Sequence, residues 1–294
     1  MARPPRIEFP GAIYHVTARG DRGEPIFKDD TDRMNLLSVF AQASSRFNAR
    51  ALAFCLMNNH YHFVIRTDKP NLSRLMRHVN GVYTQLYNRR HGASGNLFRG
   101  RFKAIIVDRN AYFLEVCRHV DLNPVRAGSV RAPHRWPWSS YVAHTGRITA
   151  PDWLDTAAVH AAVLGRPVKT SIDARRAAQR YAAFVAEGKG VPLWETGLRA
   201  QIYLGDRRFV ERMRSKSGSD RSNARNLPKS QRVAQKQRLS AYLARRRDRD
   251  SGIADAYRIG GYTMTAIGDH IGLSVSQVSR IIRNVELRQL QGAT

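Results

Sequence analysis

Cysteine is scarce in this sequence of 294 residues, which contains only Cys55 and Cys117. Two cysteines in a chain of this length make neither a disulfide framework nor a cysteine-based metal knuckle. No apolar run reaches the roughly 18 residues that a membrane helix needs, and Met1–Arg6 lacks the apolar core of a signal peptide. We therefore expect a cytoplasmic protein, associated there with the nucleoid.

Acidic residues are scarce as well. The chain has 23 Asp and Glu against 49 Lys and Arg, which gives a net charge of +26. A folded protein with this imbalance repels itself unless a polyanion neutralises it, and nucleic acid is the commonest such partner. No basic amphipathic helix with a bulky apolar face is evident, so we expect no membrane partner. Charge alone is also compatible with a ribosomal or other RNA-binding protein.

No repeat of fixed period is present, and composition divides the chain into four parts. Residues 1–148 are mixed, aromatic and regularly patterned, whereas residues 149–213 form a mostly helical extension rich in alanine. Residues 214–250 are basic and polar with few large apolar groups, which predicts a linker. Residues 251–294 return to a helical pattern.

The first part alternates between strand and helix patterns. The expected order is strand, helix, strand, strand, helix, strand, helix, and Asn110 is the expected N-cap of the last helix. This order predicts an α+β fold close to a ferredoxin-like arrangement, with the helices on one face of the sheet. The expected elements are, in chain order, 12–18, 29–46, 51–57, 60–66, 72–91, a strand within 98–107, and 110–122.

Two histidines alternate in the third expected strand, within His60-Tyr61-His62. Because a strand has a period of two, both imidazoles lie on one face, where they can chelate one divalent cation. A pair with this spacing, taken alone, is more often two half-exposed strand residues without function. The segments around the pair therefore decide its interpretation.

Four segments supply that context. They are Tyr14–Gly20 (YHVTARG), Leu56–Ile65 (LMNNHYHFVI), Phe98–Ala104 (FRGRFKA) and Leu122–Gly128 (LNPVRAG). In this order and spacing they resemble the single-tyrosine transposases of the HUH class, in particular the subgroup called REP-associated tyrosine transposases. Trp138–Tyr141 (WSSY) also fits that subgroup. The resemblance covers the first part of the chain and implies an HUH transposase domain there.

In that family the HUH histidines hold Mg²⁺ or Mn²⁺ against the scissile phosphate of single-stranded DNA, where the ion stabilises developing charge. A tyrosine on a helix attacks the phosphorus, forms a 5′-phosphotyrosine and releases a 3′-hydroxyl. A polar residue four positions later, on the same helix face, completes the metal shell. The resemblance thus implies an enzyme that cleaves and rejoins single-stranded DNA at hairpin repeats, with His60, His62 and Asn123 as metal ligands.

The sequence departs from the family at the nucleophile. The family tyrosine lies four residues before the Asn of Asn-Pro-Val, and this chain has His119 there. The helix carries an apolar stripe that leaves His119 off the buried face. The stripe consists of Phe113, Val116, Cys117 and Val120.

Three alternatives follow for catalysis. His119 attacks and forms a phosphohistidine, or Tyr112, about 10 Å away along the helix axis, attacks instead. In the third alternative the chain is a regulatory DNA-binding protein descended from a transposase, with little or no cleavage, and His119 can serve there as an additional metal ligand.

Three cations are candidate contacts to a single strand. Arg99, Arg101 and Lys103 alternate with Phe98 and Phe102, a pattern that suits phosphates and stacked bases. Lys103 is the candidate nearest the scissile phosphate. An ordinary hairpin with two core phenylalanines and solvated cations fits the same pattern.

The last part of the chain predicts a helix-turn-helix. One helix begins after Thr263, a turn follows at 272–274, and a second helix covers 275–283. The segment resembles the C-terminal DNA-binding domain of bacterial replication initiators, although a three-helix bundle for protein contacts is the alternative. The family resemblance allows either a homodimer or a monomer. Candidate contacts to a duplex major groove are Ser276, Gln277, Arg280 and Arg283.

Overall fold

The computed structural model divides the chain into two compact units, one within Glu8–Lys216 and the other within Ser217–Thr294. None of the helices in the described part is long and apolar enough to cross a membrane. The residues described are 7–188, 198–199, 202–218, 239–244, 248–258, 262 and 264–291.

A six-stranded sheet forms the centre of the first unit, with the order β2-β3-β1-β4-β6-β5. β1 lies between β3 and β4 and is antiparallel to both, and β2 is antiparallel to β3. This arrangement of the first four strands is ferredoxin-like, so the predicted α+β fold is confirmed. The strands are β1 Ala12–Arg19, β2 Ala49–Leu56, β3 His60–Thr67, β4 Lys103–Val107, β5 Leu198–Arg199 and β6 Tyr203–Leu204.

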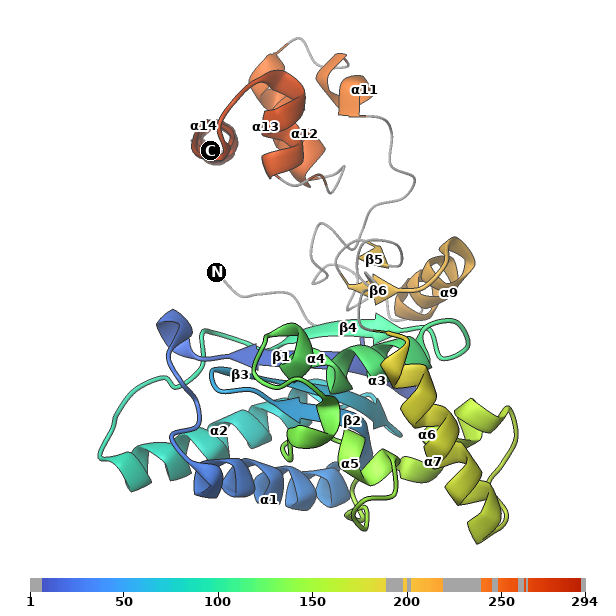
Figure 1. Cartoon of the computed structure of the whole chain (residues 1–294). Coiled ribbons are helices and arrows are strands. Elements are labelled where there is room, and N and C mark those ends of the chain that lie inside the picture. The colour runs from blue at the N-terminus through green and yellow to red at the C-terminus, as the bar shows by residue number, and fades with distance from the viewer. Residues whose placement is uncertain are drawn as a thin grey trace. The chain divides into compact units, whose positions relative to one another are not determined.

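Two helices, α1 (Asp30–Phe47) and α2 (Leu72–His91), lie side by side against one face of the sheet (Figure 1). Aromatic side chains fill the space beneath them. Phe40 of α1 stacks on Phe63 of β3 at 4.5 Å between ring centroids, and both rings are fully buried.

The opposite face is also covered, so the expectation that all helices lie on one face was wrong. There α3 (Phe113–Asp121), α6 (Thr156–Leu164) and α7 (Ser171–Ala186) pack over Val64 and other apolar residues of the sheet. The strands carry apolar side chains on both faces, and each face needs a layer of helices to exclude water. This second layer is the one that borders the histidines.

The helix α3 begins three residues later than predicted. The backbone N–H of Asn110 donates to the side chain of Asp108, which makes residues 109–112 a turn, and Tyr112 rather than Asn110 is the N-cap. The predicted buried stripe, from Phe113 to Val120, is buried as expected. A short helix, α4 (Asn123–Arg126), follows directly after α3.

Residues after 148 complete the first unit rather than only extending it. Tyr181 of α7 packs in the same cluster as Cys117 of α3, and β6 pairs in parallel with β4. The remaining elements of this unit are the 3₁₀ turns η1 Asp21–Gly23 and η2 Pro133–Arg135 and the helices α5 Tyr141–His144 and α9 Arg207–Gly218.

The second unit consists, in its described part, of four helices around a small apolar core. The turn between the last two has Gly272 at φ +71°, and a Cβ on Gly268 would lie 2.3 Å from the carbonyl oxygen of Leu273. Most of the predicted linker lies outside the described residues, but its residues 239–244 form a helix of this core. The helices are α11 Leu239–Ala244, α12 Arg249–Arg258, α13 Met264–Ile271 and α14 Val275–Gln291.

Candidate functional site

The register of the sheet gathers the candidate residues on one face. His62 lies opposite Thr17 of β1, which lies opposite Lys103 of β4. Residues directly opposite one another in antiparallel strands project to the same face, and alternate residues of one strand do so too. His62 and Lys103 therefore share this face with His60 and with His15.

His60 and His62 have the geometry of two ligands to one ion. Their ring centroids are 5.0 Å apart with an interplanar angle of 77°. Two imidazoles that each bind an ion through nitrogen at about 2.1 Å place their ring centroids about 5 Å apart. The sequence-predicted pair is thus brought together at a distance that suits shared ligation.

Both rings are tethered through Nδ1. His60 Nδ1 is 2.7 Å from Asn59 Oδ1, and His62 Nδ1 is 2.9 Å from His15 Nε2. The Nε2 atom of His62 is buried and has no hydrogen-bond partner among the described residues. A ring held at Nδ1 with its Nε2 unused is the common arrangement of a metal-binding histidine.

Electrostatics keep these rings neutral. Burial lowers the pKa of His62 well below its ordinary value, and the neighbouring histidines lower it further. Burial also lowers the pKa of His60, with a second contribution from the positive charge of Arg19, which lies opposite it on β1. Neutral imidazole is the form that binds metals. The two histidines are therefore in the ligating form at pH 7.

A third ligand is the part of the metal site that the geometry leaves open. Among the described residues, no three His, Cys, Asp or Glu side chains are grouped so that they could hold a metal. The ring of His119 is 6.4 Å from that of His62, farther than the 5.0 Å between the rings of His60 and His62, and its Nδ1 contacts Arg126. Asn123 donates from Nδ2 to the carbonyl oxygen of His119 at 3.0 Å, and its role as a ligand stays a prediction.

His119 faces the histidine group edge-on, at 6.3 Å from the ring of His15. Its Nδ1 contacts the Nη1 atom of Arg126, whose Nη2 donates to the carbonyl oxygen of Gly188 at 2.9 Å. Burial, and then the charge of Arg126, lowers the pKa of His119 to about 4. A guanidinium group only donates, so Nδ1 of His119 accepts and the neutral ring carries its proton on Nε2.

The predicted contacts in the strand before the site divide into two kinds. Arg99, Arg101 and Lys103 are exposed, as a phosphate-binding surface requires. Phe98 and Phe102 are each only 7% exposed, so neither ring offers a free face to a base. The stacking interpretation was wrong for these two rings, because both are buried, and Phe98 packs against Tyr61 and Tyr83.

Four residues of the site received no role from the sequence. His15, Arg19 and Asn59 touch or flank the histidine pair, and Arg126 holds His119. All four lie within the segments that carry the family resemblance, so the sequence could have marked them as candidates. Their contacts depend on strand register and helix packing, which the segments alone do not specify.

The predicted duplex contacts of the second unit lie at the start of α14. Ser276, Gln277 and Arg280 are exposed, whereas the side chain of Arg283 is outside the described part. Gln277 is engaged locally: its Oε1 accepts from the N–H of Ser274 at 2.9 Å, and its own N–H donates to the Ser274 hydroxyl. This capping box stabilises the helix start and occupies the Gln277 carbonyl.

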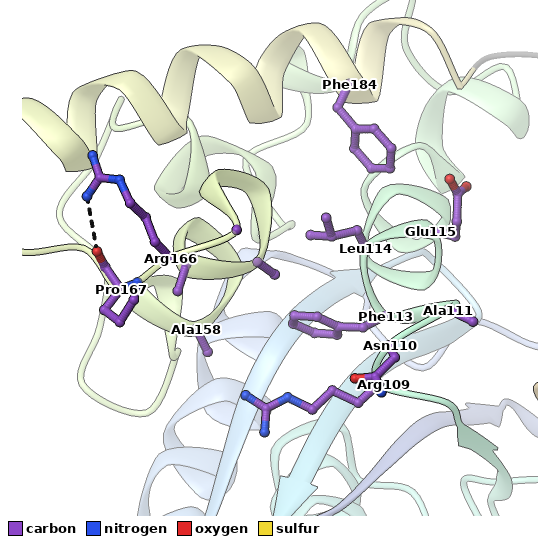
Figure 2. Close-up of a pocket in the computed structure, with 13 residues that line it drawn as sticks. Arg109, Asn110, Ala111, Phe113, Leu114, Glu115, Ala158, Arg166, Pro167 and Phe184 are labelled. Atoms are coloured by element: carbon purple, nitrogen blue, oxygen red, sulfur yellow. Dashed lines mark hydrogen bonds between the residues drawn. The ribbon is translucent and has the colours of Figure 1, made fainter. Parts of the chain in front are cut away.

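A pocket of about 620 Å³ lies elsewhere on the first unit, beside α3, α6 and α7 (Figure 2). Its lining is mixed: Phe113, Leu114 and Phe184 supply apolar surface, and Arg109, Glu115 and Arg166 supply charged groups. It contains none of the residues predicted for the site.

Comparison with known proteins follows the boundaries of the sheet and α3. Residues 9–121 match the family described as IS200-like transposases. Comparison with curated proteins gives no match.

Two solved structures are similar at a lower level. One is the REP-associated tyrosine transposase bound to a REP hairpin, with 17% identity, a TM-score of 0.43, and coverage of 51% of this chain and 89% of that one. The other is a candidate transposase from Deinococcus radiodurans R1, with 12% identity, a TM-score of 0.29, and coverage of 41% and 96%. Because both TM-scores are below 0.5, neither likeness establishes a fold or a function.

The matched residues include His15, His60, His62 and His119, so the entire histidine group lies within the family domain. Residues 9–121 are thus similar to the IS200-like transposases over the segment that holds the candidate site.

Proposed function

We propose that this chain is a DNA-binding member of the transposase family that holds the backbone of single-stranded or hairpin DNA over the histidine face and does not form a covalent intermediate. The observation that carries the proposal is the contact between Arg126 and His119. His119 stands at the position where the family resemblance places the attacking tyrosine.

Attack on phosphorus needs a lone pair on the attacking atom. The Nδ1 lone pair of His119 is occupied by Arg126, and Nε2 carries the proton. His119 must therefore either release Arg126, so that Nδ1 can attack, or move its proton from Nε2 to Nδ1, where the proton would face the donor groups of Arg126. A tyrosine at this position faces no such obstacle, because its oxygen keeps a lone pair while its proton is removed.

Tyr112 is a poor substitute nucleophile. It is the N-cap of α3, seven residues before His119 and thus about 10 Å away along the helix axis. Its ring packs against the core cluster beneath α3. Movement to the histidine group requires that packing to break.

The residues of the histidine face have the chemistry that binding of a DNA backbone requires. His60 and His62 would hold Mg²⁺ or Mn²⁺ through their Nε2 atoms, with the amide oxygen of Asn123 as the proposed third ligand. When bound, the ion polarises the phosphoryl oxygens. Lys103 projects from the same face and can pair with a phosphate.

The second unit adds a proposed duplex contact. Ser276 and Arg280 are exposed near the start of α14, where a recognition helix of a helix-turn-helix meets base edges and phosphates. Binding by both units would combine a single-stranded element with an adjacent duplex. A DNA hairpin offers both in one molecule.

The test uses the full chain, Mn²⁺ and a 5′-labelled DNA hairpin with single-stranded flanks. We expect a retarded complex on a native gel, weaker binding to the matching RNA hairpin, and no labelled adduct on a denaturing gel. An adduct formed by the natural chain and lost in His119→Ala would overturn the proposal in favour of a phosphohistidine enzyme. An adduct lost only in Tyr112→Phe would assign attack to that residue instead.

A further inference from the structure

We propose that His15 is a positioning residue for the metal site: its Nε2 accepts the Nδ1 proton of His62 and thereby fixes the His62 ring in the tautomer and orientation that present Nε2 to the ion. The inference deepens the proposed function and rests on its metal site. It assigns a task to a buried histidine that no part of the sequence interpretation used.

The contact between the two rings is close and enclosed. His15 Nε2 lies 2.9 Å from His62 Nδ1, and the rings are stacked with centroids 5.2 Å apart and an interplanar angle of 10°. His15 is 4% exposed.

Two imidazoles joined by a hydrogen bond between ring nitrogens have coupled tautomers. One ring must donate across the contact while the other accepts. If His15 donates, the proton of His62 sits on Nε2 and that atom cannot bind a metal. If His62 donates, its Nε2 lone pair is available, so binding of the ion requires His15 to be the acceptor.

The other ligand is held in the same manner. Asn59 Oδ1 is an acceptor 2.7 Å from His60 Nδ1, which leaves Nε2 of His60 as the ligating atom. Both metal-facing histidines thus have an acceptor at Nδ1, one from a turn residue and one from β1. Such partners raise metal affinity because they fix ring orientation and increase ligand basicity, and their loss typically reduces affinity about 10- to 100-fold.

The experiment measures Mn²⁺ affinity in the absence of DNA, from the electron paramagnetic resonance signal of free Mn²⁺. His15→Phe fills the space but removes the acceptor, and we expect about a 10- to 100-fold loss of affinity. His15→Gln restores an acceptor through its side-chain oxygen, and we expect it to recover most of that loss. The matched control is His144→Phe, which removes another fully buried histidine, bonded to the carbonyl oxygen of Leu52, without touching the site.

A second measurement reports the tautomer itself. With Zn²⁺ as a diamagnetic probe ion, the ¹⁵N spectrum of the natural chain should show His62 protonated at Nδ1 and metal-bound at Nε2. The proposal is overturned if His62 binds through Nδ1, if His15→Phe binds Mn²⁺ like the natural chain, or if His15→Gln is as weak as His15→Phe. Should His15→Phe fail to fold, the Gln variant and the spectrum still decide.

A separate measurement, of DNA hairpin binding, tests the proposed function without testing the role of His15. DNA hairpin binding in EDTA reports the cationic surface alone. Absence of hairpin binding by the natural chain both in EDTA and in Mn²⁺ contradicts the proposed function, whereas unchanged Mn²⁺ affinity in His15→Phe contradicts only the role of His15.

Discussion

The metal half and the nucleophile half of the histidine site are built in different ways. The metal half lies on β3, where His60 and His62 each have an acceptor at Nδ1 and a ring spacing that suits one shared ion. The nucleophile half lies on α3, where His119 accepts from Arg126 and keeps its proton on the nitrogen that attack would need. One half is arranged to give electron pairs to a cation. In the other, the Nδ1 lone pair is directed at a guanidinium group.

The difference indicates that the proposed ligands and the residue at the proposed attacking position are arranged independently of each other. In the proposed function, the ion and Lys103 bind the phosphate. Only the nucleophile half decides whether a covalent bond forms.

The largest expected difference between the halves is in metal affinity. His62→Ala removes a ligand and should reduce Mn²⁺ affinity about 100-fold or more, because a metal ligand is worth at least as much as the groups that orient it. His119→Ala should change the affinity less than about twofold, since the Nδ1 atom of His119 contacts Arg126 rather than facing an ion. Isothermal titration with Mn²⁺ measures both. Equal losses of affinity in the two variants would show that His119 is also a metal ligand and that the two halves form a single metal site.

The anchoring of the nucleophile half should have a large effect on stability. Asp121, at the end of α3, is fully buried and accepts from the Ser140 hydroxyl at 2.6 Å and the Tyr181 hydroxyl at 2.7 Å. Asp121→Ala leaves both hydroxyls without this acceptor, and we expect a loss of about 3 kcal/mol in the free energy of unfolding. Urea denaturation measures it, with the exposed Asp68→Ala as a control within about 0.5 kcal/mol.

The same carboxyl group predicts a pH dependence. Burial raises the pKa of Asp121 to about 7, above its value in the unfolded chain. The folded state therefore binds more protons between about pH 4 and 7, and this group's contribution to stability falls as pH rises through that window. Asp121→Asn cannot titrate, so its stability should lack this component of the pH dependence. Parallel pH profiles for the two proteins would contradict the assignment.

For the metal half, the alternation of side chains along a strand predicted the two candidate ligands but not the residues that hold them. The period of two placed His60 and His62 on one face, and the apolar stripe of α3 correctly left His119 off the buried side. The contact between His15 and His62 could not be predicted, because it joins residues 47 positions apart and depends on the register of β1 against β3.

The second layer of helices was missed for a related reason. Local patterns identify α3 and α7 but not the face they cover, and the short strands β5 and β6 have two residues each, too few for a periodic signal. The contact between Arg126 and His119 was equally hidden, since it forms across the break between α3 and α4.

The smallest expected effect is that of a single phosphate contact. Lys103→Ala should weaken binding to every DNA sequence about equally and reduce the slope of log affinity against log salt by about one. Lys69→Ala is the matched control, because Lys69 is also exposed but lies beyond the far end of β3 from His60. Fluorescence anisotropy between low and moderate salt measures both slopes, and an equal change in the two variants would remove Lys103 from the site.

The central claim is that position 119 alone separates this chain from a cleaving enzyme. The most direct measurement compares the natural chain with His119→Tyr, each incubated with Mn²⁺ and the labelled DNA hairpin and resolved on a denaturing gel. The account predicts a covalent protein–DNA adduct in His119→Tyr only, abolished by adding His62→Ala. An adduct of equal yield in the natural chain would contradict it.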